Sequence, residues 1–156
     1  MPMHTWFECK IRYEKTMENG MNKKVTEPYL VDALSFTEAE ARIIEEMTPF
    51  ITGEFIVSDI KRANYSELFP SDEEAADRWF KCKLVFITLD EKSGAEKKTS
   101  TQVLVQAADL RDAVKKLDEG MKGTMADYQI ASVAETAIMD VYPFSAEKDD
   151  KPEVQS

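Results

Sequence analysis

Two five-residue stretches carry the rarest side chains of this chain. They are Trp6-Phe7-Glu8-Cys9-Lys10 and Trp79-Phe80-Lys81-Cys82-Lys83, and they differ only at the middle residue. The chain has two tryptophans and two cysteines, and all four lie in these stretches. Paired thiols are candidate metal ligands or redox groups, and paired indoles are candidate stacking surfaces. Any chemistry has to be sought here first.

The thiols lack the companions that metal or redox chemistry requires. There is no Cys-x-x-Cys pair, and the only histidine, His4, lies in the N-terminal stretch. Residues two apart in a strand share a face. The two apolar faces that result are Phe7-Cys9-Ile11 and Phe80-Cys82-Leu84. A cysteine on such a face is a small hydrophobe with a raised thiol pKa, so we expect both to be core residues.

Other constellations of functional residues are missing from the sequence. With one histidine, neither Ser-His-Asp nor Cys-His catalysis has a base to draw on. The acidic runs at 38–46 and 72–74 lack the spacing of a calcium loop, and the glycines match no phosphate-binding fingerprint. We therefore predict no catalytic residue, no metal site and no cofactor, and we favour a protein that is not an enzyme.

The tryptophans and their cationic neighbours are the candidate binding residues. Alternation places them on the strand face opposite the cysteines. The set is Trp6, Lys10 and Arg12 in the first stretch, with Trp79 and Lys83 in the second. One interpretation is that the indoles pack across a sheet near the mid-line of two similar halves. The alternatives are an exposed patch for a protein partner or for self-association, and a stacking surface for single-stranded nucleic acid.

Composition indicates an ordinary globular protein with an acidic surface. The 156 residues are 43% hydrophobic and 32% charged, and the net charge is −10. That charge opposes binding to phosphate backbones and to anionic membranes, although an acidic surface can also mimic DNA. No signal peptide and no run of about 18 apolar residues is present, so we expect a cytoplasmic protein without a membrane span.

The similarity of the two stretches extends along the chain and indicates an internal duplication. The stretches are 73 residues apart, and later matches such as Gly20 with Gly94 are 74 apart. Each copy predicts two strands, a capped helix and a third strand. In the first copy the predicted elements are strands at 6–15, 24–34 and 55–60, the last continued at 63–69 after a bend, with a helix from Ser35. In the second copy they are strands at 80–87, 102–108 and 128–142, with a helix from Asp109.

These elements predict an α+β fold made of two β-β-α-β units related by a pseudo-twofold axis. Each sheet is mostly antiparallel, with the first strand between the other two and one main helix per half. We expect a single duplicated domain over 1–144, with half one at 5–69, an acidic joint at 70–78, half two at 79–144 and a disordered charged tail at 145–156. The halves either share one sheet of about six strands or pack face to face.

The sequence resembles an uncharacterised family, a domain of unknown function from Bacteroidetes and their phages or mobile elements. The resemblance covers about residues 4–144. It is carried by Trp6-Phe7-x-Cys9-Lys10, by Leu30-Val31-x-Ala33 and by the helix start Ser35-Phe36-Thr37-Glu38-Ala39-Glu40-Ala41. It implies a phage-related origin and brings no activity, substrate or site.

Three functions remain open at this point. The first is a small non-catalytic binding or accessory protein of the cytoplasm, acting on a protein partner or through self-association. The second is a small-molecule binder or enzyme with a cleft between the halves, lined by Tyr13, Tyr29, Tyr128 or acidic side chains. The third is a nucleic-acid-related protein, through single-strand binding or acidic mimicry, which the net charge of −10 makes the weakest.

Overall fold

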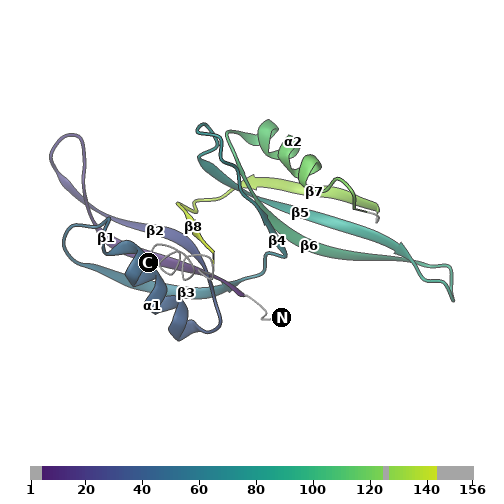
Figure 1. Ribbon diagram of the computed structural model, residues 1–156, viewed down its shortest axis with the longest axis horizontal. Coiled ribbons are helices and arrows are strands. Elements are labelled where there is room, and N and C mark those ends of the chain that lie inside the picture. Colours follow the sequence, from purple (N-terminus) through teal and green to yellow (C-terminus); the bar gives the residue numbers. More distant parts are fainter. Residues whose placement is uncertain (1–4, 125–126, 144–156) are drawn as a thin grey trace, which may run out of the picture. The chain divides into compact units, whose positions relative to one another are not determined.

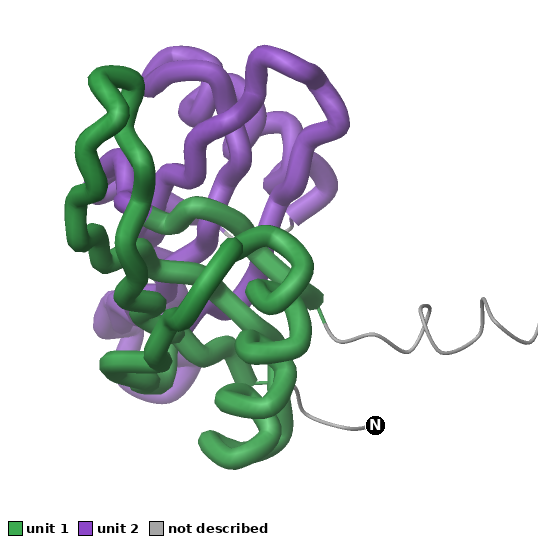
Figure 2. The backbone as a smooth tube through the Cα atoms, turned by 90° about the vertical axis from the view of Figure 1, so that its left-hand side faces the viewer, with its two compact units in different colours: residues 1–63, 138–156 green, residues 64–137 purple. Residues whose placement is uncertain are grey.

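The computed structural model describes residues 5–124 and 127–143 and shows an α+β protein (Figure 1). In the described residues, two helices accompany eight strands in two four-stranded sheets. The chain divides into two compact units: residues 1–63 with 138–156 form unit 1, and residues 64–137 form unit 2 (Figure 2). His4 and the predicted tail at 145–156 lie outside the described residues.

Unit 1 is built around strand β1 (Thr5–Thr16), which lies between two antiparallel neighbours. Its other elements are β2 (Asn22–Ala33), α1 (Phe36–Met47), β3 (Phe55–Ala63) and β8 (Val141–Tyr142), and the sheet order is β3-β1-β2-β8. The predicted central place of the first strand is confirmed. Its inward face packs on α1 through Phe7, Cys9 and Ile11, all fully buried. Burying each large apolar side chain contributes about 1.5–3 kcal/mol.

Unit 2 repeats this arrangement with its own residues. Its elements are β4 (Glu67–Phe69), β5 (Arg78–Leu89), β6 (Glu96–Ala107), α2 (Leu110–Gly120) and β7 (Asp127–Glu135), in the sheet order β4-β6-β5-β7. Strand β5 is antiparallel to both β6 and β7. The β3 ladder shifts register after Lys10 and the β7 ladder shifts after Lys83, 73 residues later. The two units therefore share even their irregularities.

Both helices begin as the sequence predicts. The Ser35 hydroxyl accepts a hydrogen bond from the Glu38 amide at 3.1 Å, and the Glu38 carboxylate accepts one from the Leu34 amide at 2.6 Å. In α2, Asp109 and Asp112 make the same reciprocal pair. Each capping box satisfies two of the amides that a helix start leaves without a partner. The caps fix where the chain turns from the second strand onto the sheet.

The short strands β4 and β8 are the feature that the sequence did not predict. Strand β4 runs parallel to β6, and β8 runs parallel to β2. We expected 63–69 to continue the strand at 55–60 after a bend, and 128–142 to be one strand. Each segment instead breaks, and its last part joins the sheet of the other unit. The unit boundaries consequently fall after residues 63 and 137 rather than at the acidic joint. The alternative of one six-stranded sheet is wrong, because the described strands form two separate sheets.

A cationic side chain from each helix holds the incoming segment. In unit 1, the Arg42 guanidinium donates to the carbonyl oxygens of Asp32 and Pro143, the latter at 2.9 Å. In unit 2, the Lys116 ammonium lies 3.0 Å from each of three oxygens. These belong to Ser71, Glu73 and Asp112. We call the contacts of Arg42 and of Lys116 the clamps of units 1 and 2. The two side chains are 74 residues apart, so they occupy the same position in their helices.

Replacing Lys116 tests whether the clamp stabilises unit 2. Lys116→Met keeps the aliphatic stem but leaves three oxygens without their cation, and we expect the free energy of unfolding in urea to fall by about 1–2 kcal/mol. Lys115→Met, one position along the helix and exposed, is the matched control and should change it by less than about 0.5 kcal/mol. Equal stability of the two variants would show that the clamp contributes nothing.

Candidate functional site

Three of the five predicted binding residues share one face of β1 in unit 1. Trp6, Lys10 and Arg12 point away from α1, because they alternate with the buried residues that pack on it. Trp6 lies opposite Asp32 and Ala63 and is half-buried. Lys10 is also half-buried, and Arg12 is exposed. Of these three residues, Arg12 is thus the most exposed to solvent.

The other two predicted residues lie in unit 2. Trp79 is only 4% exposed, and its carbonyl oxygen accepts hydrogen bonds from the amide and the hydroxyl of Thr136, both at 2.9 Å. Lys83 is exposed on the same strand. An indole covered to this extent has little face left for a base to stack on. Trp6 lies in unit 1 and Trp79 in unit 2. Neither unit by itself therefore forms the two-indole stacking surface that the sequence allowed.

Both cysteines are buried among apolar side chains. Cys9 and Cys82 have no exposed surface and belong to the cores of their units. Burial raises the pKa of the Cys9 thiol to about 12, with Glu8 and Glu40 adding to the shift, and burial alone raises that of Cys82 to about 11. Because the thiolate is the reactive form, neither residue is equipped for nucleophilic or redox chemistry near neutral pH.

The raised thiol pKa values predict a loss of stability in alkaline solution. A group whose pKa rises on folding stabilises the fold fully below its unfolded value, here 9.0, and this contribution disappears as the pH passes the folded values near 11 and 12. We expect the free energy of unfolding, measured by urea titration, to fall from pH 9 upward. It should fall less steeply in the Cys9→Ala/Cys82→Ala variant, and identical slopes would contradict this explanation.

The acidic clusters do not assemble a metal site in the described part of the chain. No group of three or more His, Cys, Asp or Glu side chains there is arranged to hold a metal ion. Glu73 instead pairs with Lys116, and Glu38 caps α1. These two carboxylates therefore have structural partners within the protein.

Among the described residues, no helix has the length and apolar character needed to cross a membrane.

A tyrosine cluster in unit 1 was only partly anticipated. The hydroxyls of Tyr13 and Tyr29 donate to the same oxygen of Glu27, at 2.9 and 3.2 Å, and Lys15 lies 3.6 Å from the other oxygen. Burial raises the pKa of both tyrosines, and the Glu27 carboxylate raises it further, so both hydroxyls stay protonated. One of the alternative functions drawn from the sequence required tyrosines or acidic side chains around a cleft. Two of the tyrosines converge instead on a carboxylate, which sequence reasoning did not single out.

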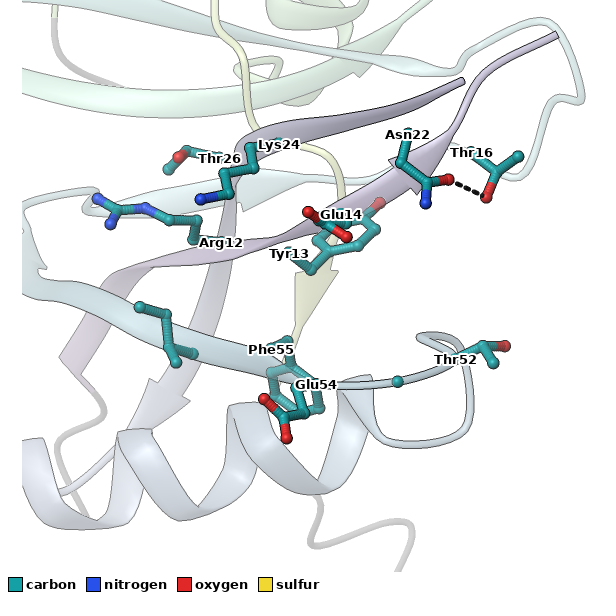
Figure 3. Close-up of a pocket in the computed structure, with 12 residues that line it drawn as sticks. Arg12, Tyr13, Glu14, Thr16, Asn22, Lys24, Thr26, Thr52, Glu54 and Phe55 are labelled. Carbon is teal, nitrogen blue, oxygen red and sulfur yellow. Dashed lines mark hydrogen bonds between the residues drawn. The ribbon is translucent and has the colours of Figure 1, made fainter. Parts of the chain in front are cut away.

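A hollow opens where β1 and β3 of unit 1 separate beyond their last pair, Tyr13 with Phe55 (Figure 3). Its volume is about 900 Å³. Its walls come from the β1–β2 hairpin and from the loop that leads into β3, and they comprise Arg12, Tyr13, Glu14, Thr16, Asn22, Lys24, Thr26, Thr52, Gly53, Glu54, Phe55 and Ile56. Of the predicted binding residues, only Arg12 lines it.

The outer edge of β7 is a second candidate surface. Among the described strands, β7 ends the sheet of unit 2, so one side of its backbone pairs with β5 and no other described strand lies beside its second side. Its seven central residues, 128–134, contain no charged residue, no glycine and no proline. Unpaired amides and carbonyls on such a strand are a template for pairing with another extended chain.

Comparison with known proteins places the chain in a family. Residues 5–144 match the family described as Domain of unknown function (DUF4494). This protein is a member of the DUF4494 family. The match agrees with the resemblance to an uncharacterised family that the sequence showed. No curated protein and no solved structure matches this DUF4494 chain.

Proposed function

We propose that this DUF4494 protein is a non-catalytic binding protein that holds an extended segment of a partner protein along the edge of β7. The observation that carries the proposal is the uncharged run at 128–134 on that edge. Strand addition gives affinity through main-chain hydrogen bonds and specificity through alternate side chains. The resemblance to a family of phages and mobile elements supports an accessory role, and we place the protein in the cytoplasm.

The equivalent edge strand of unit 1, β3, carries charged side chains of the kind that protect an edge from pairing with another chain. They are Asp59, Lys61 and Arg62. The cross-strand register makes Ser132 and Ala134 of β7 the counterparts of Asp59 and Lys61. Two of the three charges on β3 are therefore replaced by small uncharged side chains on β7, and the third, Arg62, has Glu135 as its counterpart. A strand that needed only to avoid aggregation would keep those two charges.

Charge indicates which partner the edge would accept. The uncharged run is flanked by Asp127 and Glu135, and the whole chain has a net charge of −10. A second copy of the chain would bring the same negative charge to the edge, which opposes self-association. A segment with an uncharged core and basic flanks would be attracted and held in register. We therefore assign the edge to a different protein that carries such a segment.

Labelled synthetic peptides test this proposal by fluorescence anisotropy. A peptide of alternating valines and threonines with lysines at both ends should bind at least about tenfold more tightly than the same core with glutamates at both ends. A proline in the centre of the core should abolish binding, because it removes a ladder donor. Equal binding of the lysine and glutamate peptides would overturn the assignment of a basic-flanked partner.

A matched pair of variants locates the binding edge. Ala131→Lys places a charge at the exposed, unpaired position of the β7 irregularity and should abolish binding of the lysine peptide. Ser58→Lys changes the corresponding exposed position of β3 and should leave it unchanged. Unchanged binding by Ala131→Lys would refute β7 as the site. Sedimentation showing a dimer that Ala131→Lys dissociates would replace the partner by a second copy.

A further inference from the structure

The hollow of unit 1 presents two cations on neighbouring strands. The β1–β2 register places Arg12 opposite Thr26, and Lys24 lies two residues from Thr26 on β2, so the two cations are diagonal neighbours on one face. Figure 3 shows both side chains extending to the same side of the hairpin, with Thr26 beside them. Neither forms an ion pair within the part of the chain that the structure describes. Glu14 lies directly opposite Lys24 in the register but forms no ion pair with it, so the two cations beside a hydroxyl can hold an oxyanion here as a cationic grip.

Unit 2 shows that the fold does not need the charge of Arg12 or of Glu14. In its register, Val85 takes the place of Arg12, opposite Ser100 and Gln129, and Ile87 takes the place of Glu14, opposite Lys98. The same strands thus form the same ladders with aliphatic side chains at these two positions. Among the charges of the hollow, Arg12 and Glu14 are therefore particular to unit 1, whereas Lys24 has a counterpart in Lys98. The shared architecture does not require Arg12.

The remaining walls limit the ligand to a monoanion with an apolar body. Ile56 is 53% exposed and, with Phe55, offers an apolar surface within the hollow. Glu14 and Glu54 also line it and would repel a second negative charge. The net charge of −10 likewise disfavours polyphosphates and nucleic acids.

We propose that the hollow binds a small amphipathic carboxylate. Its carboxylate group is held by Arg12 and Lys24, and its apolar body lies against Ile56. This proposal does not depend on strand addition at β7, which lies in unit 2.

Titration of the ¹⁵N-labelled full chain with octanoate, followed by NMR, tests the proposal. We expect saturable shifts of the amides of Arg12, Lys24, Thr26 and Ile56. Octanamide has the same apolar body without the charge and should bind at least about tenfold more weakly. Shifts confined to unit 2, no saturable shift, or equal binding of octanoate and octanamide would each overturn the proposal.

Two exposed lysines at equivalent positions provide a matched control. Lys24→Gln should weaken octanoate binding about threefold to fivefold, as expected for an exposed charge pair, and Arg12→Gln at least as much. Lys98→Gln, the counterpart of Lys24 in unit 2, should leave it unchanged. Ile56→Ser should weaken octanoate without weakening acetate, which lacks the apolar body. Equal dissociation constants for Lys24→Gln and Lys98→Gln would refute the cationic grip.

Discussion

The short parallel strands β4 and β8 are the contacts on which the rest of each unit depends. The first strand of each unit lies between two antiparallel neighbours, which leaves the second strand at the edge. That edge contains fully buried residues, Leu30 and Val31 in β2 and Leu104 and Val105 in β6. Buried backbone groups need partners, and the short strand supplies them at those residues. Arg42 and Lys116 then hold the segments in place with charge-assisted hydrogen bonds.

This arrangement makes unit 1 discontinuous along the chain. Unit 1 begins at the N-terminus, but its sheet is completed only by residues that follow β7. Unit 2 in turn begins with β4, which follows β3 directly. Contacts of such long sequence separation form late, because the loop between their ends must first be closed. Unit 2, by contrast, is a continuous segment that interrupts the sequence of unit 1.

The surfaces with functional potential lie where the two units differ. Their cores use equivalent residues, and both helices begin with the same reciprocal cap. The outward positions diverge: unit 1 has Arg12 and Glu14 where unit 2 has Val85 and Ile87, and β3 has Asp59 and Lys61 where β7 has Ser132 and Ala134. Packing constrains the inner positions in both units alike. The outer positions are free to acquire separate binding surfaces on one architecture.

The sequence by itself determined the local structure, because alternation, capping residues and turn residues act within a few positions. It predicted the α+β class, the central first strands, both helix starts and the burial of Cys9 and Cys82. It did not predict β4 and β8, since strands of three and two residues carry too little pattern and their pairing is set by distant edges. Only the tertiary structure decided that Trp79 is covered, that Glu27 gathers two tyrosines, and that Arg12 and Lys24 share a hollow, because each depends on residues brought together from separate strands.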